Sequence, residues 1–262
     1  MPFVGQISPD VWAGITIAAY AGVAAGVIIW RALRSEWGWR VWMLYGIGSL
    51  YSRLCYHWRS NRPCPFSDAS PAIVIGNHRC PLDPLFIWLG NISRRPIGFM
   101  MAREYYETPG LRFISSSVEC IPVLRDGKDT SATRAALRRL QAGKLLGVFP
   151  EGRINMGAGL LPANPGVGWL ALRSRAPVYP VFLHNTPPTH NMVEPFYTFT
   201  RVRVTYGDPI DLSAFYDRPM SEALVREATD YMMAALARLG EESALEGEPA
   251  APPAILPMTA AG

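Results

Sequence analysis

An uncharged run of 20 residues, 11–30, is the feature that most restricts how this 262-residue chain can fold. As an α-helix it is about 30 Å long, the thickness of the hydrocarbon core of a bilayer. Its Gly and Ala content also fits a helix buried inside a protein. The nearest charge before the run is Asp10, and Arg31 and Arg34 follow it, the reverse of the charge order in a cleaved signal peptide. We therefore expect a transmembrane helix over about 11–30, with the rest of the chain on the cytoplasmic side by the positive-inside rule.

The next apolar run, 41–52, is too short to cross a bilayer and indicates a helix lying at the membrane surface, over about 41–58. Aromatic side chains surround it, and Trp and Tyr favour the level of the lipid headgroups because each joins an apolar body to a polar tip. Residues 1–60 are therefore predicted to form a membrane anchor. The aromatic residues are Trp30, Trp37, Trp39, Trp42, Tyr45, Tyr51, Tyr56 and Trp58.

Residues 61–240 alternate short apolar runs with helical patterns, which predicts an α/β domain. We expect a mixed, largely parallel sheet flanked by helices. From residue 241 to 262 the chain is rich in Glu, Ala and Pro without periodicity, and we expect a disordered tail there. The predicted strands are 72–76, 97–101, 120–124, 145–149, 178–183 and 202–206, and the predicted helices are 84–91, 129–142, 165–173 and 221–239.

Charge and cysteine content exclude some classes of protein. The net charge of +4 is mild and no basic run of the kind that binds nucleic acid is present, so no nucleic-acid partner is expected. The four cysteines form no C-x-x-C pair and no zinc-like group with the histidines, which indicates free thiols in a reducing compartment. No metal or organic cofactor is expected.

A strand, a polar loop and a helix start follow one another over residues 73–84, with the sequence IVIGNHRCPLDP. Asp83 and Pro84 suit the start of a helix, since Asp is a favoured N-cap and Pro a favoured first residue. His78 and Asp83 share the loop, where a neutral imidazole can act as a general base and a carboxylate can hold its tautomer. Taken alone, the stretch is explained equally well by a helix cap at Asp83 and a structural histidine at position 78.

Four segments together resemble, in order and spacing, the sequence blocks of the glycerolipid acyltransferases, the family of 1-acylglycerol-3-phosphate acyltransferases. Residues 77–84 (NHRCPLDP) are similar to its NHxxxxDP block, and 149–153 (FPEGR) to its FPEG block. Residues 121–125 (IPVLR) and 176–181 (APVYPV) are similar to the second and fourth blocks. The resemblance covers about residues 60–210. It implies transfer of an acyl chain from the thioester of coenzyme A or acyl carrier protein to a lysophospholipid hydroxyl.

The resemblance also implies roles for particular residues. His78 would be the general base and Asp83 the group that orients it. A guanidinium fork matches phosphate oxygens, so Arg125 is expected to grip the acceptor's phosphate, although a solvated turn explains it too. Residues 150–152 fit a β-turn, which is a purely structural explanation of Glu151. The resemblance implies that Glu151 helps to position the glycerol part of the acceptor. The predicted catalytic residues are His78 and Asp83, and the predicted substrate-binding residues are Arg125, Glu151, Gly152 and Arg153.

The sequence departs from the family pattern at several positions. Cys80 stands where the family commonly has Ser, and a Cys beside a His leaves open a hydrolase with a thiol nucleophile. Glu119 stands where Gly is usual. The usual FPEG-x-R-S becomes FPEGRIN, which places Arg153 one residue early. Three arginines of the 129–142 helix are then an alternative source of positive charge for the acceptor: Arg134, Arg138 and Arg139.

The sequence thus predicts a membrane-bound 1-acylglycerol-3-phosphate O-acyltransferase, facing the cytoplasm at a bacterial inner membrane. Its partners would be the bilayer, a lysophospholipid acceptor, and acyl-CoA or acyl carrier protein as the donor. The altered third block leaves open a different acceptor, such as a lyso-ornithine lipid or another lysophospholipid. A non-catalytic lipid-binding membrane protein of the same fold is the further alternative.

Overall fold

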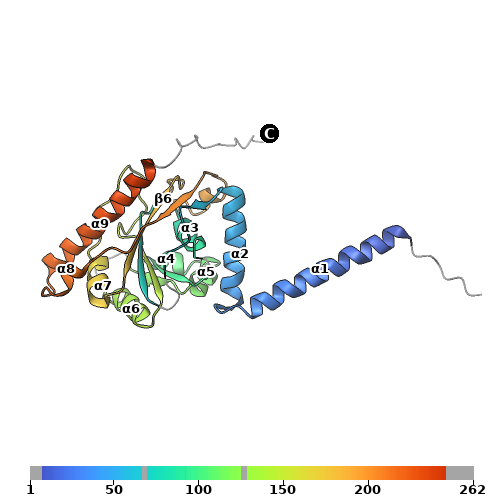
Figure 1. Ribbon diagram of the computed structural model, residues 1–262, viewed down its shortest axis with the longest axis horizontal. Helices are drawn as coiled ribbons and strands as arrows, with labels where there is room; N and C mark the ends of the chain where they lie inside the picture. The colour runs from blue at the N-terminus through green and yellow to red at the C-terminus, as the bar shows by residue number, and fades with distance from the viewer. Residues whose placement is uncertain (1–7, 67–69, 92, 125–128, 246–262) are drawn as a thin grey trace, which may run out of the picture.

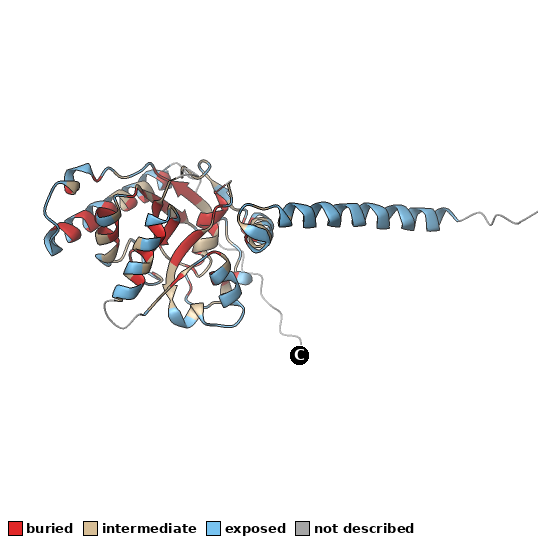
Figure 2. Cartoon of the chain, turned by 90° about the horizontal axis from the view of Figure 1, so that it is seen from below, coloured by how far each residue is buried: buried red, intermediate tan, exposed pale blue. Residues whose placement is uncertain are grey.

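The computed structural model describes residues 8–66, 70–91, 93–124 and 129–245. Helix α1 (Pro9–Leu33) extends away from the rest of the molecule, with Ser8 as its N-cap and Pro9 as its first residue (Figure 1). It is exposed along almost all of its length (Figure 2). The helix expected over 11–30 is therefore present, and it is long and apolar enough to cross a bilayer. An exposed apolar helix of this length is consistent with membrane association.

Helix α2 (Gly38–Cys55) begins beyond a short turn and runs along the domain. Gly48 faces helix α3 (Asp83–Leu89), and a Cβ atom at Gly48 would lie 2.6 Å from the Leu85 side chain. The opposite face of α2 exposes large apolar side chains. One face of α2 thus packs on the domain, and the other face is apolar and exposed. The exposed side chains are Trp39, Ile47, Leu50 and Leu54.

A seven-stranded sheet forms the centre of the described chain, in the order β1-β7-β6-β2-β5-β3-β4. All neighbouring strands are parallel except β6 and β7, so the predicted mixed, largely parallel sheet is confirmed. The strands are β1 (Arg59–Ser60), β2 (Ala72–Gly76), β3 (Ile97–Ala102), β4 (Ile121–Val123), β5 (Leu145–Val148), β6 (Val178–His184) and β7 (Arg203–Tyr206).

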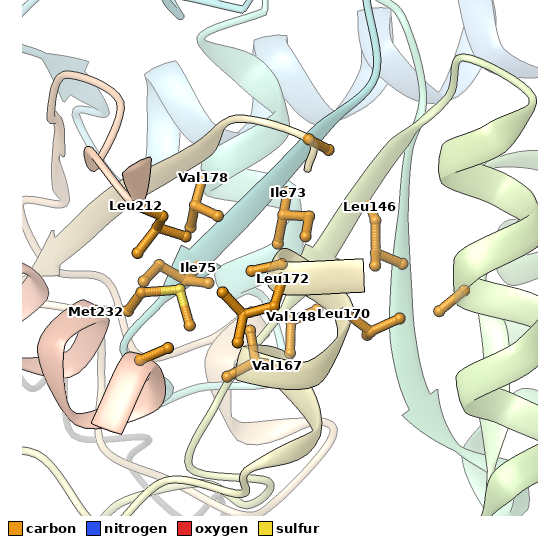
Figure 3. Packing of buried hydrophobic residues seen from close by; sticks show 14 of the residues in the cluster. Ile73, Ile75, Leu146, Val148, Val167, Leu170, Leu172, Val178, Leu212 and Met232 are labelled. Atoms are coloured by element: carbon orange, nitrogen blue, oxygen red, sulfur yellow. The ribbon is translucent and has the colours of Figure 1, made fainter. Parts of the chain in front are cut away.

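Helices cover both faces of this sheet, and the alternation of side chains along β2 shows why its sequence is apolar throughout. Ile73 and Ile75 belong to a core under α6 (Thr130–Gln141), α7 (Gly166–Ser174) and α9 (Glu222–Leu245). Figure 3 shows these two side chains packed near Leu172 and Met232 of the covering helices. Ala72 and Val74 point to the other face, into a second core with α2 and α3. A strand buried on both faces needs apolar residues at every position.

Several elements differ from the prediction. β1 pairs with β7, so the sheet begins two residues before the predicted boundary at residue 61. α9 continues to Leu245, so the predicted tail is wrong for residues 241–245; the buried Ser243 Oγ lies 2.7 Å from His184 Nε2 and holds the end of α9 on β6. The rest of the tail lies outside the described residues. Short helices too small to show periodicity were not predicted: α4 (Arg103–Tyr106), α5 (Leu111–Ser117), η1 (Glu194–Phe196) and α8 (Ser213–Tyr216).

Candidate active site

The loop that follows β2 lies at the carboxyl end of the parallel strands, where open α/β sheets bind ligands. Asn77 fixes the start of this loop by continuing the strand pairing with its side chain. Its Nδ2 donates to the carbonyl oxygen of Leu183 (3.0 Å), and its Oδ1 accepts from the Leu183 N–H (2.7 Å). Because Asn77 is buried and bonded to β6 in both directions, the next residue, His78, leaves the sheet at a defined point.

His78 and Asp83 lie together, as predicted from their spacing. His78 Nδ1 is 2.9 Å from Asp83 Oδ2, which also accepts hydrogen bonds from the backbone N–H groups of Arg79 (2.6 Å) and Cys80 (2.8 Å). Asp83 is fully buried. Since its carboxylate accepts, Nδ1 carries the hydrogen and Nε2 keeps a lone pair. No residue in the described part of the chain forms a hydrogen bond with that Nε2.

The predicted N-cap role of Asp83 is wrong. Leu82 occupies the N-cap position of α3 and Asp83 is the first residue of the helix, without a side-chain cap hydrogen bond. The reason is visible in the hydrogen bonds of the preceding loop. The Asp83 carboxylate turns back to bind the loop N–H groups and the imidazole in place of the free N–H groups of its own helix.

The ring of His78 lies flat on that of Phe149, with the centroids 4.0 Å apart and the planes 11° apart. Phe149 stacks in turn on Phe99, at 5.2 Å. The imidazole is therefore held by a hydrogen bond at one edge and by an aromatic surface on one face. The His78 side chain is 17% exposed, so a reactant can still reach it.

The predicted β-turn after β5 is confirmed, and it brings Glu151 to the same place. The Gly152 N–H donates to the carbonyl oxygen of Phe149 (3.0 Å), and Gly152 adopts a φ of +68°, which favours glycine. The buried Glu151 accepts from the His78 N–H through Oε1 (3.1 Å) and from the Leu161 N–H through Oε2 (2.8 Å). Glu151 thus joins the loop after β5 to the loop that carries His78.

Asn155 is a part of this site that the sequence reading did not identify. Its backbone N–H donates to the carbonyl oxygen of His78 (2.7 Å), and its Nδ2 donates to Glu151 Oε2 (2.9 Å) and to the carbonyl oxygen of Gly159 (2.7 Å). Asn155 is buried. A signal in the sequence could have identified Asn155, because this residue stands where the third block usually has Ser.

The other residues proposed to bind the substrate differ in where the structure places them. Gly152 and Arg153 are exposed on the turn beside Glu151. Arg125 lies outside the described residues. Arg139 does not fit the suggested role in binding a phosphate, because it is buried and its guanidinium is already engaged. It donates to the Glu119 carboxylate and to three backbone carbonyls, those of Leu145, Glu119 and Pro96. Arg134 and Arg138 are exposed on α6.

The two other departures from the family pattern have structural explanations. Burial and the nearby charge of Asp83 raise the pKa of the Cys80 thiol well above its usual value, so the thiol stays protonated and is a poor nucleophile. Glu119 adopts a φ of +57°, a conformation that favours the usual Gly. Its carboxylate is held there by Lys144 and Arg139, at 2.7 and 2.8 Å. Over the described residues, no group of three or more His, Cys, Asp and Glu side chains could hold a metal ion.

A carboxylate-oriented histidine at the carboxyl end of a mostly parallel sheet defines the class: an α/β protein with a site suited to general-base chemistry. Sequence comparison gives the family. Residues 54–184, half of the chain, match the Acyltransferase family, and the chain belongs to it. The acyltransferase membership expected from the four blocks is therefore confirmed.

A solved structure has a similar fold, the 1-acyl-sn-glycerophosphate (LPA) acyltransferase PlsC from Thermotoga maritima. The superposition has a TM-score of 0.62 and covers 86% of this chain and 90% of that chain, at 19% sequence identity. At that identity the similarity confirms the predicted fold class and leaves the substrates to be argued from the site.

Proposed function

We propose that the protein transfers an acyl chain from a thioester to the hydroxyl of a membrane-borne lysolipid, with lysophosphatidic acid acylated at the sn-2 position as the specific reaction. The observation that carries the proposal is the His78–Asp83 pair, 2.9 Å apart, whose Nε2 is left with an unused lone pair. The family membership supplies the reaction class, acyl transfer.

In this proposal His78 Nε2 accepts the proton of the acceptor hydroxyl as its oxygen attacks the thioester carbonyl. The tetrahedral intermediate then collapses, the carbon–sulfur bond breaks, and the imidazolium returns the proton to the leaving sulfur. The products are an ester and a free thiol, so the histidine is regenerated. Asp83 holds Nδ1–H and stabilises the imidazolium, the base-and-orienter relation of a hydrolase triad without a protein nucleophile. General-base catalysis of this kind contributes about 10²–10⁴ in rate.

Glu151 supports the base through the chain backbone, because its carboxylate accepts from the His78 N–H. One lone pair of Oε1 remains for the glycerol hydroxyl of an acceptor, the role that the family resemblance implies for Glu151. We assign the phosphate of the acceptor to Arg125 and Arg153, and Gly152 to the turn that presents Arg153. A guanidinium matches phosphate geometry, and Arg153 is exposed beside the catalytic loop.

A bilayer-bound acceptor suits the surface beside the site. The segment 193–199 packs on α2, where the rings of Phe196 and Tyr51 lie 5.9 Å apart, and it exposes Val193 and Tyr197. Together with the apolar face of α2, these side chains form an exposed apolar surface on the domain. We propose that this surface meets the cytoplasmic leaflet and that α1 crosses the membrane.

The test is acyl transfer by the full-length protein in lipid vesicles, with acyl-CoA or acyl carrier protein as donor and a panel of lysolipids as acceptors. Phosphatidic acid formed from lysophosphatidic acid supports the proposal in full. A preference for another acceptor, such as a lyso-ornithine lipid, would keep the chemistry and change the substrate; the displaced Arg153 of the third block is the feature that favours this second candidate. No product with any donor and acceptor would contradict the enzyme and favour a non-catalytic lipid-binding protein.

A further inference from the structure

The turn between α1 and α2 borders a cleft of about 400 Å³ that the catalytic site does not use. Arg94 lines it from the loop before β3, whereas His78 follows the end of the parallel strand β2. The cleft therefore lies at the opposite edge of the sheet from the catalytic histidine. Its main side chains are Arg31, Arg34, Glu36, Trp37, Trp42 and Arg94.

The loop that presents Arg94 is tightly built. Ser93 Oγ donates to Asn91 Oδ1 (2.7 Å), and Asn91 Nδ2 donates to the carbonyl oxygen of Arg95 (3.0 Å). Trp37 Nε1 donates to the carbonyl oxygen of Ser93 (3.0 Å), which attaches the loop to the turn between the two helices. Arg94 itself has a φ of +60°, uncommon outside glycine, and its side chain is exposed. The neighbouring Arg95 is buried. The loop therefore directs Arg94 to the surface and Arg95 to the interior.

The cleft has a net positive charge that the described part of the chain does not neutralise. Arg31, Arg34 and Arg94 have no carboxylate within ion-pair distance among the described residues, and Glu36 is the one acidic side chain that lines the cleft. Two of the guanidinium groups are oriented by aromatic rings: Arg34 lies 4.8 Å from the Trp30 ring centroid and Arg94 lies 5.5 Å from that of Tyr45. A cation–π contact orients a guanidinium and leaves its charge available.

Arg31 and Arg34 have an ordinary explanation, since basic residues favour the carboxyl end of a helix and the cytoplasmic end of a membrane span. Neither rule applies to Arg94, which is far away in the sequence and lies on no helix. Its convergence with the end of α1 places three guanidinium groups and two tryptophans at the level where a bilayer-spanning α1 would leave the hydrocarbon. Phosphate oxygens are the natural partner of guanidinium forks, and Trp favours the headgroup region.

We propose that this cleft binds the phosphate of an anionic membrane phospholipid, as a site separate from the one for the acylated substrate. The proposal rests on the membrane location put forward above and does not depend on the acyl transfer reaction. The occupant is the headgroup of a membrane lipid.

The test measures lipids retained by the full-length protein in detergent, without an acyl donor. The protein is incubated with equal amounts of phosphatidylglycerol and phosphatidylcholine, and bound lipids are counted by native mass spectrometry. Arg94→Gln is compared with Arg40→Gln, a matched control: Arg40 is exposed on α2 and lies 5.3 Å from the Phe113 ring centroid, outside the cleft. Circular dichroism verifies that both variants remain folded.

We expect the wild type to retain phosphatidylglycerol in preference to phosphatidylcholine, and Arg94→Gln to lower that preference about fivefold, the effect of one cationic side chain on anionic lipid. Arg40→Gln should leave it nearly unchanged, and the triple variant Arg31→Gln/Arg34→Gln/Arg94→Gln should abolish it. Equal losses in Arg94→Gln and Arg40→Gln would mean general surface charge and overturn the proposal. Displacement of the lipid by millimolar inorganic phosphate would also overturn it, in favour of a soluble phosphate. Because no acyl donor is present, an inactive enzyme would not affect either result.

Discussion

The backbone N–H of Asn155 donates to the carbonyl oxygen of His78 at 2.7 Å, although the two residues are separated by more than 70 positions in the chain. β2 and β5 are neighbouring parallel strands, so the loops that leave their carboxyl ends come together. Glu151 reinforces the connection through the His78 N–H. The loop of the third block thus holds the backbone of the proposed base at both its N–H and its carbonyl group.

Asn155→Ala should weaken this connection. The variant loses the donor to Glu151 Oε2 and the acceptor for the Gly157 N–H, and a buried group left without its partner costs about 1–3 kcal/mol. We expect a lower melting temperature and a lower kcat, measured by thermal unfolding and by initial rates. Asn164→Ala is the matched control, because the exposed Asn164 side chain also accepts from a backbone N–H, that of Gly166, at 2.9 Å. Equal behaviour of the two variants would mean that Asn155 is only a loop residue.

Asp83→Asn should reduce acyl transfer by at least about 10², since the amide can no longer hold the Nδ1–H tautomer while accepting both loop N–H groups. Stopped-time assays of product at saturating substrates measure the loss in kcat. Asp208→Asn serves as the control, because Asp208 is exposed and pairs with Arg62 at 2.7 Å, far along the chain from the loop that carries His78. Activity of Asp83→Asn within a few fold of the wild type would contradict the orienting role.

Cys80→Ser should retain activity within about tenfold. The Cys80 thiol is buried and its raised pKa keeps it protonated, so it is not the nucleophile that an acyl-enzyme mechanism needs. Rapid mixing with an acyl thioester should show no burst of released thiol in either the wild type or the variant. A burst that disappears in Cys80→Ser would instead establish a covalent intermediate at this cysteine.

The stability of the fold should fall as the pH decreases from about 6.5 towards 4. Burial, with the nearby charge of Arg203, lowers the pKa of His184 to about 4. The unfolded chain takes up a proton at its ordinary pKa near 6.5, whereas the folded chain resists it, so acid favours unfolding across that interval. Urea unfolding at several pH values gives the free energy of unfolding as a function of pH. Between pH 6.5 and 4 this free energy should change less steeply with pH in His184→Gln than in His190→Gln, where the replaced histidine is exposed. An identical pH dependence in the two variants would show that His184 does not cause the loss of stability in acid.

The sequence predicted the central sheet well because its strands are buried on both faces. β2 is present as predicted, Ala72–Gly76, since an unbroken apolar run ending at a glycine has few other interpretations. The end of α9 was missed because its last turn is polar in sequence and is held by a contact between distant residues, Ser243 and His184. β1 was missed because two residues carry no periodic signal.

The candidate site was predicted in part. The pairing of His78 with Asp83 follows from local spacing, and the turn at Glu151 follows from its Pro and Gly. The role of Asn155 and the burial of Arg139 depend on which loops the sheet brings together, which local patterns do not encode. The contact of Arg125 with an acceptor phosphate remains a prediction.

The most direct test of the account compares acyl transfer by the wild type and by His78→Ala, both reconstituted in vesicles with labelled lysophosphatidic acid and the better of the two donors. The account predicts that the wild type forms phosphatidic acid and that the variant, folded by circular dichroism, is slower by more than about 10², the usual contribution of a general base. Undiminished product formation by His78→Ala would contradict the proposed role of this histidine.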